Sequence, residues 1–170
     1  MPPKRRKKAA KPAVPAAERQ PYFRTVADNR RARFDYDLME RVEAGLALTG
    51  TEIKSVRAGQ ANIRDAYAQV RDGEMWLHNM HVAPWSGGGP WNHEPLRARR
   101  LLLHRGEIAR LARQVLQKGL TIVPLRLYLK GHHATVEVAL AKGRRTYDKR
   151  QAIIRRETER EIGRAMRRDA

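Results

Sequence analysis

The sequence predicts a mainly β domain with short helices that lies between two basic tails. Three observations support this class: segments in which apolar and polar residues alternate, a two-residue hairpin turn at Asp72-Gly73, and an uneven distribution of charge. Residues 1–33 carry 11 cations and 2 carboxylates, residues 142–170 carry 11 and 5, and the net charge of residues 34–141 is only +3. Since the chain has 170 residues, we expect one compact domain with a cationic segment at each end.

Composition predicts where that domain begins and ends. Residues 1–22 are rich in proline, alanine and lysine and contain little to bury, which predicts a disordered basic arm. We expect the compact domain over residues 23–143. Residues 144–170 include good helix formers but few apolar positions, which predicts a basic C-terminal tail that is disordered or frayed without a partner.

The first predicted elements of the domain are a strand and a short helix. Apolar and acidic residues alternate over residues 34–48, which predicts a long first strand bent at Gly45. Residues 49–59 then predict a short helix, because Thr49 has Glu52 three residues on, the spacing of a capping box.

A hairpin, a loop, a helix and a strand pair complete the domain. Residues 65–82 form two alternating segments around Asp72-Gly73, a type I′ hairpin signature. Residues 84–91 contain three glycines and two prolines, which predicts a mobile loop without regular structure. Residues 107–118 carry the apolar stripe of an amphipathic helix, and residues 121–140 predict two strands around Gly131-His132-His133. About five strands with interspersed short helices favour an OB-fold-like Greek-key barrel with flanking helices.

We find no arrangement of residues that supports catalysis. The chain has no cysteine, which excludes disulfides and cysteine-bound zinc, and its histidines lack metal-ligand spacing. The acidic residues Asp35, Asp37, Glu40 and Glu43 could suggest a magnesium-dependent nuclease, but a solvated strand face is the simpler explanation. We therefore predict a protein that is not an enzyme and has no cofactor or metal. No apolar run approaches ~18 residues and the N-terminus lacks a secretory signal, so we expect a cytoplasmic protein.

The basic ends indicate a polyanionic partner. Nucleic acid is favoured over an anionic membrane, because neither basic end has the apolar face of an interfacial helix. On the short helix, Glu52, Lys54 and Arg57 are expected near the solvent, where they and Asn62 can form hydrogen bonds to RNA bases and sugars. An ordinary charged helix surface remains the alternative.

Two further groups of side chains suit RNA. Arg97, Arg99 and Arg100 are expected to position phosphates. Tyr147 can stack on a base while nearby cations neutralise the RNA backbone. Those cations are Lys142, Arg144, Arg145, Lys149 and Arg150. The alternative is a solvent-exposed charged segment in which Tyr147 has no function.

Read together, these residues resemble the bacterial SsrA-binding protein family, small protein B (SmpB). The resemblance extends from about Asn29 to the C-terminus. It rests on the following strings: Asn29-Arg30-Arg31-Ala32-Arg33-Phe34-Asp35-Tyr36, Glu43-Ala44-Gly45-Leu46, Leu48-Thr49-Gly50-Thr51-Glu52-Ile53-Lys54-Ser55-Val56-Arg57-Ala58-Gly59, Leu101-Leu102-Leu103-His104, Ala141-Lys142-Gly143 and Tyr147-Asp148-Lys149-Arg150.

The resemblance implies an OB-fold barrel that binds the tRNA-like domain of transfer-messenger RNA and supports its alanylation by alanyl-tRNA synthetase. With elongation factor Tu, the family escorts this RNA into stalled 70S ribosomes. Its C-terminal tail then occupies the decoding centre, next to 16S rRNA, and the empty mRNA channel, where it folds into a helix. The resemblance thus implies an adaptor of trans-translation. We expect it to be a monomer.

Site residues follow from the same resemblance, position by position. Glu52, Leu102 and His104 fall where the family contacts transfer-messenger RNA, with Lys54, Arg57 and Asn62 as neighbours. Tyr147 takes the place of a ring that stacks on a decoding-centre base. The basic start of the tail is matched by Lys142, Gly143, Arg144, Arg145, Asp148, Lys149 and Arg150.

Two other functions remain as alternatives to this adaptor. One is a generic OB-fold RNA-binding or ribosomal protein without a role in tagging, and the other is the metal-dependent nuclease.

Overall fold

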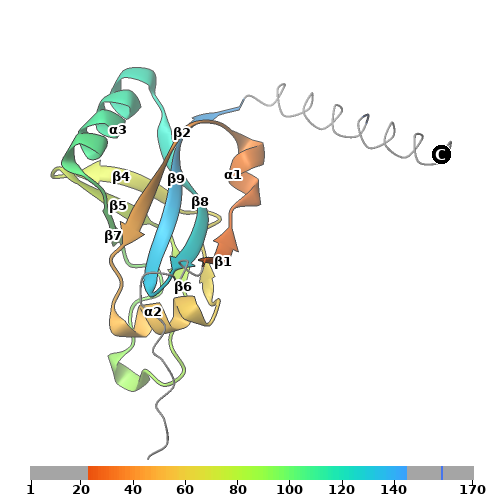
Figure 1. Ribbon diagram of the computed structural model, residues 1–170, viewed down its shortest axis with the longest axis vertical. Coiled ribbons are helices and arrows are strands. Elements are labelled where there is room, and N and C mark those ends of the chain that lie inside the picture. The colour runs from red at the N-terminus through yellow and green to blue at the C-terminus, as the bar shows by residue number, and fades with distance from the viewer. Residues whose placement is uncertain (1–22, 145–157, 159–170) are drawn as a thin grey trace, which may run out of the picture.

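The structure is a computed structural model that describes residues 23–144 and Thr158 (Figure 1). Its strands are β1 (Phe23–Asp28), β2 (Tyr36–Leu46), β3 (Ala61–Asn62), β4 (Tyr67–Arg71), β5 (Glu74–His78), β6 (His81–Val82), β7 (Arg99–Leu102), β8 (Thr121–Lys130) and β9 (His133–Gly143). Its helices are α1 (Arg30–Asp35), α2 (Gly50–Arg57), α3 (Arg105–Lys118) and the 3₁₀ helix η2 (Gly89–Trp91).

Seven antiparallel strands form one sheet that closes on itself. Their order is β1-β8-β4-β5-β7-β2-β9, and a further pairing of β8 with β9 joins the two sides into a barrel. The two longest ladders involve β9, which pairs with β2 on one side and with β8 on the other. Buried side chains such as Met75, Leu77 and Val136 fill the interior. The helices lie outside, with α3 and α2 near opposite ends of the barrel (Figure 1). The prediction of a mainly β barrel with flanking helices is confirmed.

Several local predictions are also confirmed. Asp72 and Gly73 both have positive φ angles, 53° and 74°, as a type I′ turn between β4 and β5 requires. Helix α2 begins with the expected capping box, since the Thr49 backbone N–H donates to a Glu52 carboxylate oxygen at 2.7 Å. Helix α3 ends at Gly119, which has a φ of +59°.

The predicted first strand is wrong at its beginning. β1 precedes it, and Phe34 and Asp35 belong to α1 rather than to a strand. The reason is Asn29, which is buried: its Oδ1 accepts from the Ala32 backbone N–H at 3.0 Å and so starts α1. Its Nδ2 donates to carbonyls of distant segments, those of Ile63, Arg64 and Pro124.

Two further expectations differ from the structure. The irregular pairing of β2 with β9 lies between Leu38 and Arg41, whereas Gly45 stays in register with Thr135, so no break in the ladder marks the predicted bend. The loop after β6 was expected to lack regular structure, but it contains η2. Pro90 is compatible with a helix at this place because it lies in the first turn, where its missing N–H costs no helical hydrogen bond.

Candidate nucleic-acid interface

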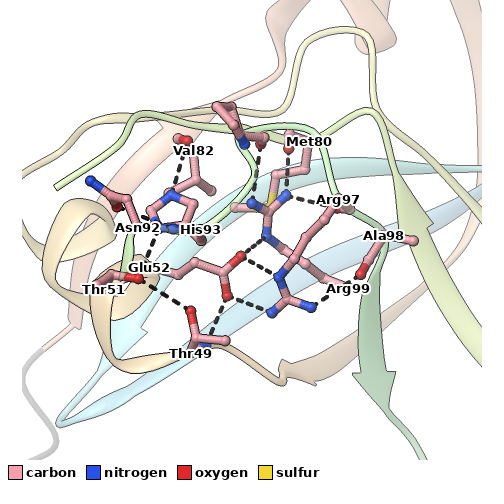
Figure 2. Close-up of polar contacts among 11 residues, drawn as sticks. Thr49, Thr51, Glu52, Met80, Val82, Asn92, His93, Arg97, Ala98 and Arg99 are labelled. Carbon is pink, nitrogen blue, oxygen red and sulfur yellow. Dashed lines mark hydrogen bonds and ion pairs between the residues drawn. The ribbon is translucent and has the colours of Figure 1, made fainter. Parts of the chain in front are cut away.

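A buried ionic cluster joins α2 to β7 (Figure 2). Glu52 and Arg99 have no exposed surface. Glu52 Oε1 accepts from Arg99 Nε at 2.9 Å and from Arg97 Nε at 2.7 Å, while Oε2 accepts from Arg97 Nη2 at 2.6 Å. Arg99 also donates to the backbone carbonyls of Met80 and Pro95, so one guanidinium connects the helix with the residue before β6 and with the β6–β7 loop.

The electrostatics of this cluster keep Glu52 ionised. Burial by itself raises the pKa of Glu52, but hydrogen bonds from Arg97 and Thr49 and the charges of Arg99 and Arg97 outweigh it and lower the pKa to about 2. Burial lowers the pKa of Arg99, although the neighbouring Glu52 charge opposes that shift. A carboxylate buried in this way can be stable only while both guanidinium groups stay in place.

The cluster corrects two expectations from the sequence. Glu52 was expected near the solvent with its carboxylate available to RNA, but that carboxylate is buried and accepts four hydrogen bonds. Arg97, Arg99 and Arg100 were expected to position phosphates. Arg99 is buried, Arg97 is held by Glu52, and the half-exposed Arg100 pairs with Glu74 at 2.7 Å. Side-chain alternation explains the difference: β7 points Arg99 inward and Arg100 outward.

Leu102 and His104 lie at the far end of β7, beside an open groove of about 830 Å³. Leu102 points outward from the barrel and is 51% exposed. Gly45 lies opposite it on β2, and a Cβ on Gly45 would come within 3.4 Å of the Leu102 side chain. The groove is lined by Glu43, Asp72, Gly73, Glu74, Arg100, Leu101, Leu102, Leu103, His104, Arg105, Glu107 and Ile108.

Glu43 also lines this groove, although the sequence did not indicate it as a site residue. It was assigned to a solvated strand face; the structure has it exposed on β2, and also places it in the same groove as Leu102 and His104. Its exposed carboxylate lies 3.9 Å from the Lys130 ammonium. Alternation along β2 predicted that Glu43 faces outward, but only the pairing of β2 with β7 brings it next to Leu102.

Lys54, Arg57 and Asn62 lie away from the groove, on α2 and β3. All three are exposed. Arg57 Nη2 donates to the His132 carbonyl at 3.3 Å, and Asn62 Oδ1 accepts from the Arg64 backbone N–H at 2.9 Å. The predicted RNA-binding residues therefore form two groups, and the buried Glu52–Arg99 pair connects them through β7.

The first residues predicted for the tail belong to the barrel. Lys142 and Gly143 are the last residues of β9, paired with Asp37 and Tyr36 of β2. The Arg144 backbone N–H donates to the Asp35 carbonyl at 3.0 Å, and its Nη2 donates to Asp37 Oδ1 at 3.0 Å. The other predicted tail residues, Arg145, Tyr147, Asp148, Lys149 and Arg150, lie outside the described residues, as does the predicted C-terminal helix.

The described part of the chain shows neither a metal site nor a membrane-spanning helix. No group of three or more His, Cys, Asp or Glu side chains within residues 23–144 could hold a metal ion. None of the helices described is long and apolar enough to cross a membrane.

Comparison with known proteins identifies the family. The family model of the SmpB protein matches residues 26–168. The chain belongs to the SmpB family. The SsrA-binding protein of Roseiflexus sp. (strain RS-1) is 58% identical over 144 residues, which cover 84% of this chain and 91% of that relative. The SsrA-binding protein of Carboxydothermus hydrogenoformans is 51% identical over 142 residues, covering 84% and 95%.

A solved structure of this SmpB family gives the same result. It is described as "tmRNA-SmpB: a journey to the center of the bacterial ribosome", and one of its chains is 45% identical to this chain, with a TM-score of 0.60. The match covers 74% of this chain and 92% of that chain. The resemblance seen in the sequence is thus confirmed.

Proposed function

We propose that this protein is an RNA-binding adaptor of trans-translation. It binds the tRNA-like domain of transfer-messenger RNA and delivers that RNA to stalled 70S ribosomes. The observation that carries the proposal is membership of the SmpB family over residues 26–168, together with 58% identity to a protein named for binding SsrA. The solved relative that combines tmRNA, SmpB and the ribosome supports the same assignment.

The barrel is the part that holds the RNA in this proposal. Exposed Leu102 and His104, with Glu43 beside them, offer one apolar and two polar contacts in an open groove. Lys54, Arg57 and Asn62 offer cations and an amide at a second place, where they position phosphates and sugars. Glu52 contributes from inside, because its pairing with Arg99 sets the position of β7 and therefore of Leu102.

The segment after the barrel serves the ribosome. Arg144, tied to Asp35 and Asp37, is fixed to the barrel, and the proposed tail begins directly after it. In the proposal, residues 145–170 enter the decoding centre and the empty mRNA channel, and Tyr147 stacks on a base there among Lys149 and Arg150. Elongation factor Tu and alanyl-tRNA synthetase act through the bound RNA. The protein itself is a cytoplasmic monomer that catalyses no reaction.

Capture of RNA from a cell lysate tests the assignment. The full-length protein, immobilised and incubated with total RNA freed of ribosomes, is expected to retain one dominant RNA that carries a tRNA-like end. A generic OB-fold RNA-binding or ribosomal protein would retain fragments of ribosomal RNA with equal preference, and that result would reject the adaptor function.

A further inference from the structure

The loop between β6 and β7 presents an indole ring that nothing in the proposed function uses. Trp91, the last residue of η2, is 88% exposed, the highest value among the large hydrophobic residues that the structure describes. Tryptophan is on average highly buried, because its ring removes a large apolar area from water. Such an exposed ring on a loop is therefore a feature that requires an explanation.

The loop is held in shape from within. Asn92 Oδ1 accepts from the backbone N–H groups of Trp85 and His93 at 3.0 and 3.2 Å, and its Nδ2 donates to the Trp85 carbonyl at 2.7 Å. A Cβ on Gly88 would lie 2.8 Å from the Asn92 side chain, so this close approach requires glycine. Trp91 is thus presented on a preorganised loop, which reduces the conformational entropy lost when a ligand binds.

A histidine fastens the same loop to α2 (Figure 2). His93 Nε2 lies 3.1 Å from the Val82 carbonyl, which can only accept, so this nitrogen donates. His93 Nδ1 lies 2.9 Å from the Thr51 hydroxyl on α2. The loop containing η2 and helix α2 consequently lie together at one end of the molecule (Figure 1).

The charges at this end identify the kind of partner. The exposed charged residues of α2 are Lys54 and Arg57, because its acid, Glu52, is buried. The loop contributes one exposed carboxylate, Glu94. Cations and an exposed aromatic ring at the same end of a molecule are a combination with which proteins bind unpaired nucleotides, the ring for the base and the cations for the phosphates. A stable interface with a protein partner would need a much larger apolar patch than Trp91 and the half-exposed Leu96 provide.

We propose that Trp91 is a stacking platform for an unpaired base of the bound RNA, and that Lys54 and Arg57 neutralise the neighbouring phosphates. This inference rests on the proposed RNA-binding function and extends the RNA-binding surface to Trp91 and its loop, which the sequence did not indicate as site residues. The buried Glu52–Arg97–Arg99 cluster holds the loop and α2 together, because Arg97 lies at the end of the loop, Arg99 begins β7, and both donate to Glu52 of α2.

Affinity for transcribed transfer-messenger RNA, measured with the full-length protein, tests the platform. Trp91→Ala is expected to weaken binding about 5- to 150-fold, the loss of one base–aromatic stack. Trp91→Phe keeps a ring and is expected to stay within about 3-fold of the wild type. The matched control is Leu116→Ala on α3, which removes an 84% exposed apolar side chain elsewhere and is expected to leave affinity unchanged.

Salt dependence separates stacking from phosphate contact. Trp91→Ala is expected to leave the slope of log affinity against log salt unchanged, whereas Lys54→Ala is expected to reduce it by about 1. The platform is refuted if Trp91→Ala binds the RNA like the wild type, or if Trp91→Phe loses as much as Trp91→Ala. Failure of the wild type to select transfer-messenger RNA over ribosomal RNA would reject the proposed function itself, a distinct result.

Discussion

Replacing Glu52 by alanine tests the role of the buried cluster most directly. Arg99 has no exposed surface, and the change removes its counter-ion. The fold must then either keep an unpaired buried charge or release β7 from α2. Removal of one partner of a buried ion pair costs about 3–5 kcal/mol. The lowering of the Glu52 pKa from its ordinary value of 4.5 to about 2 corresponds to roughly 3 kcal/mol at neutral pH, which agrees with that range.

Urea denaturation at neutral pH, followed by circular dichroism, measures this loss. Glu74→Ala is the matched control, because Glu74 also pairs with an arginine of β7, Arg100, but both side chains are nearly half exposed. That pair is expected to contribute less than about 1 kcal/mol. The unfolding free energy of Glu52→Ala is therefore expected to fall several times more than that of Glu74→Ala.

Binding of transfer-messenger RNA then separates a positioning role from direct contact. If Glu52 acts through β7, Glu52→Ala and Arg99→Met are expected to weaken RNA binding alike, since either one releases the strand that carries Leu102. Arg99 is buried and cannot touch RNA itself. A positioning role for Glu52 is excluded if Glu52→Ala loses RNA binding while its stability stays within about 1 kcal/mol of the wild type and Arg99→Met binds normally.

The remaining predictions concern pH, the tail and Asn29. The folded-state pKa of Glu52 lies below its ordinary value, so the stabilising effect of its charge is complete above about pH 5 and is lost towards pH 2. Urea melts at a series of acid pH values measure this loss. The unfolding free energy of the wild type is expected to fall roughly 3 kcal/mol more than that of Glu52→Gln over this interval. Truncation after Arg144, which keeps all of β9, is expected to preserve RNA binding but abolish peptide tagging in a stalled-ribosome translation assay; tagging by the truncated protein would contradict the role of the tail. In the same assay Tyr147→Ala is expected to reduce tagging and Tyr147→His to retain it, since both Tyr and His can stack. Asn29→Ala removes the cap of α1 and the donor to three carbonyls, so it is expected to lower the unfolding free energy by about 2–3 kcal/mol in the same urea melts. Asn29→Asp keeps the cap but turns a buried carboxylate oxygen towards those carbonyl oxygens, so it is expected not to recover that loss.

The segments of the candidate site could be predicted from the sequence, but the contacts between them could not. The capping box at Thr49 and the resemblance around Leu101–His104 indicated the segments that form the buried cluster and the groove. Neither could reveal that Glu52 faces the interior, because its guanidinium partners lie 45 and 47 residues further along the chain. Glu43 could not be grouped with Leu102 for the same reason, since Leu102 belongs to β7, which lies next to β2 only in the folded sheet.

The sequence by itself determined the features that depend on a few consecutive residues. These are the turn at Asp72-Gly73, the start of α2 at Thr49, the end of α3 at Gly119 and the concentration of charge at the two ends. Each follows from backbone sterics, capping bonds or composition, which act over short distances along the chain. The strings that place the chain in the SmpB family are equally local.

The tertiary structure alone decided which charged side chains are exposed and which are buried. Arg99 and Arg100 are adjacent in sequence and identical in chemistry, yet one holds Glu52 inside the molecule and the other reaches the solvent. The difference arises because a paired strand sends alternate side chains to opposite faces, and the register of β7 against β2 and β5 assigns the faces. That register buries Arg99 beside Glu52 and leaves Leu102 exposed on the outer face of the barrel.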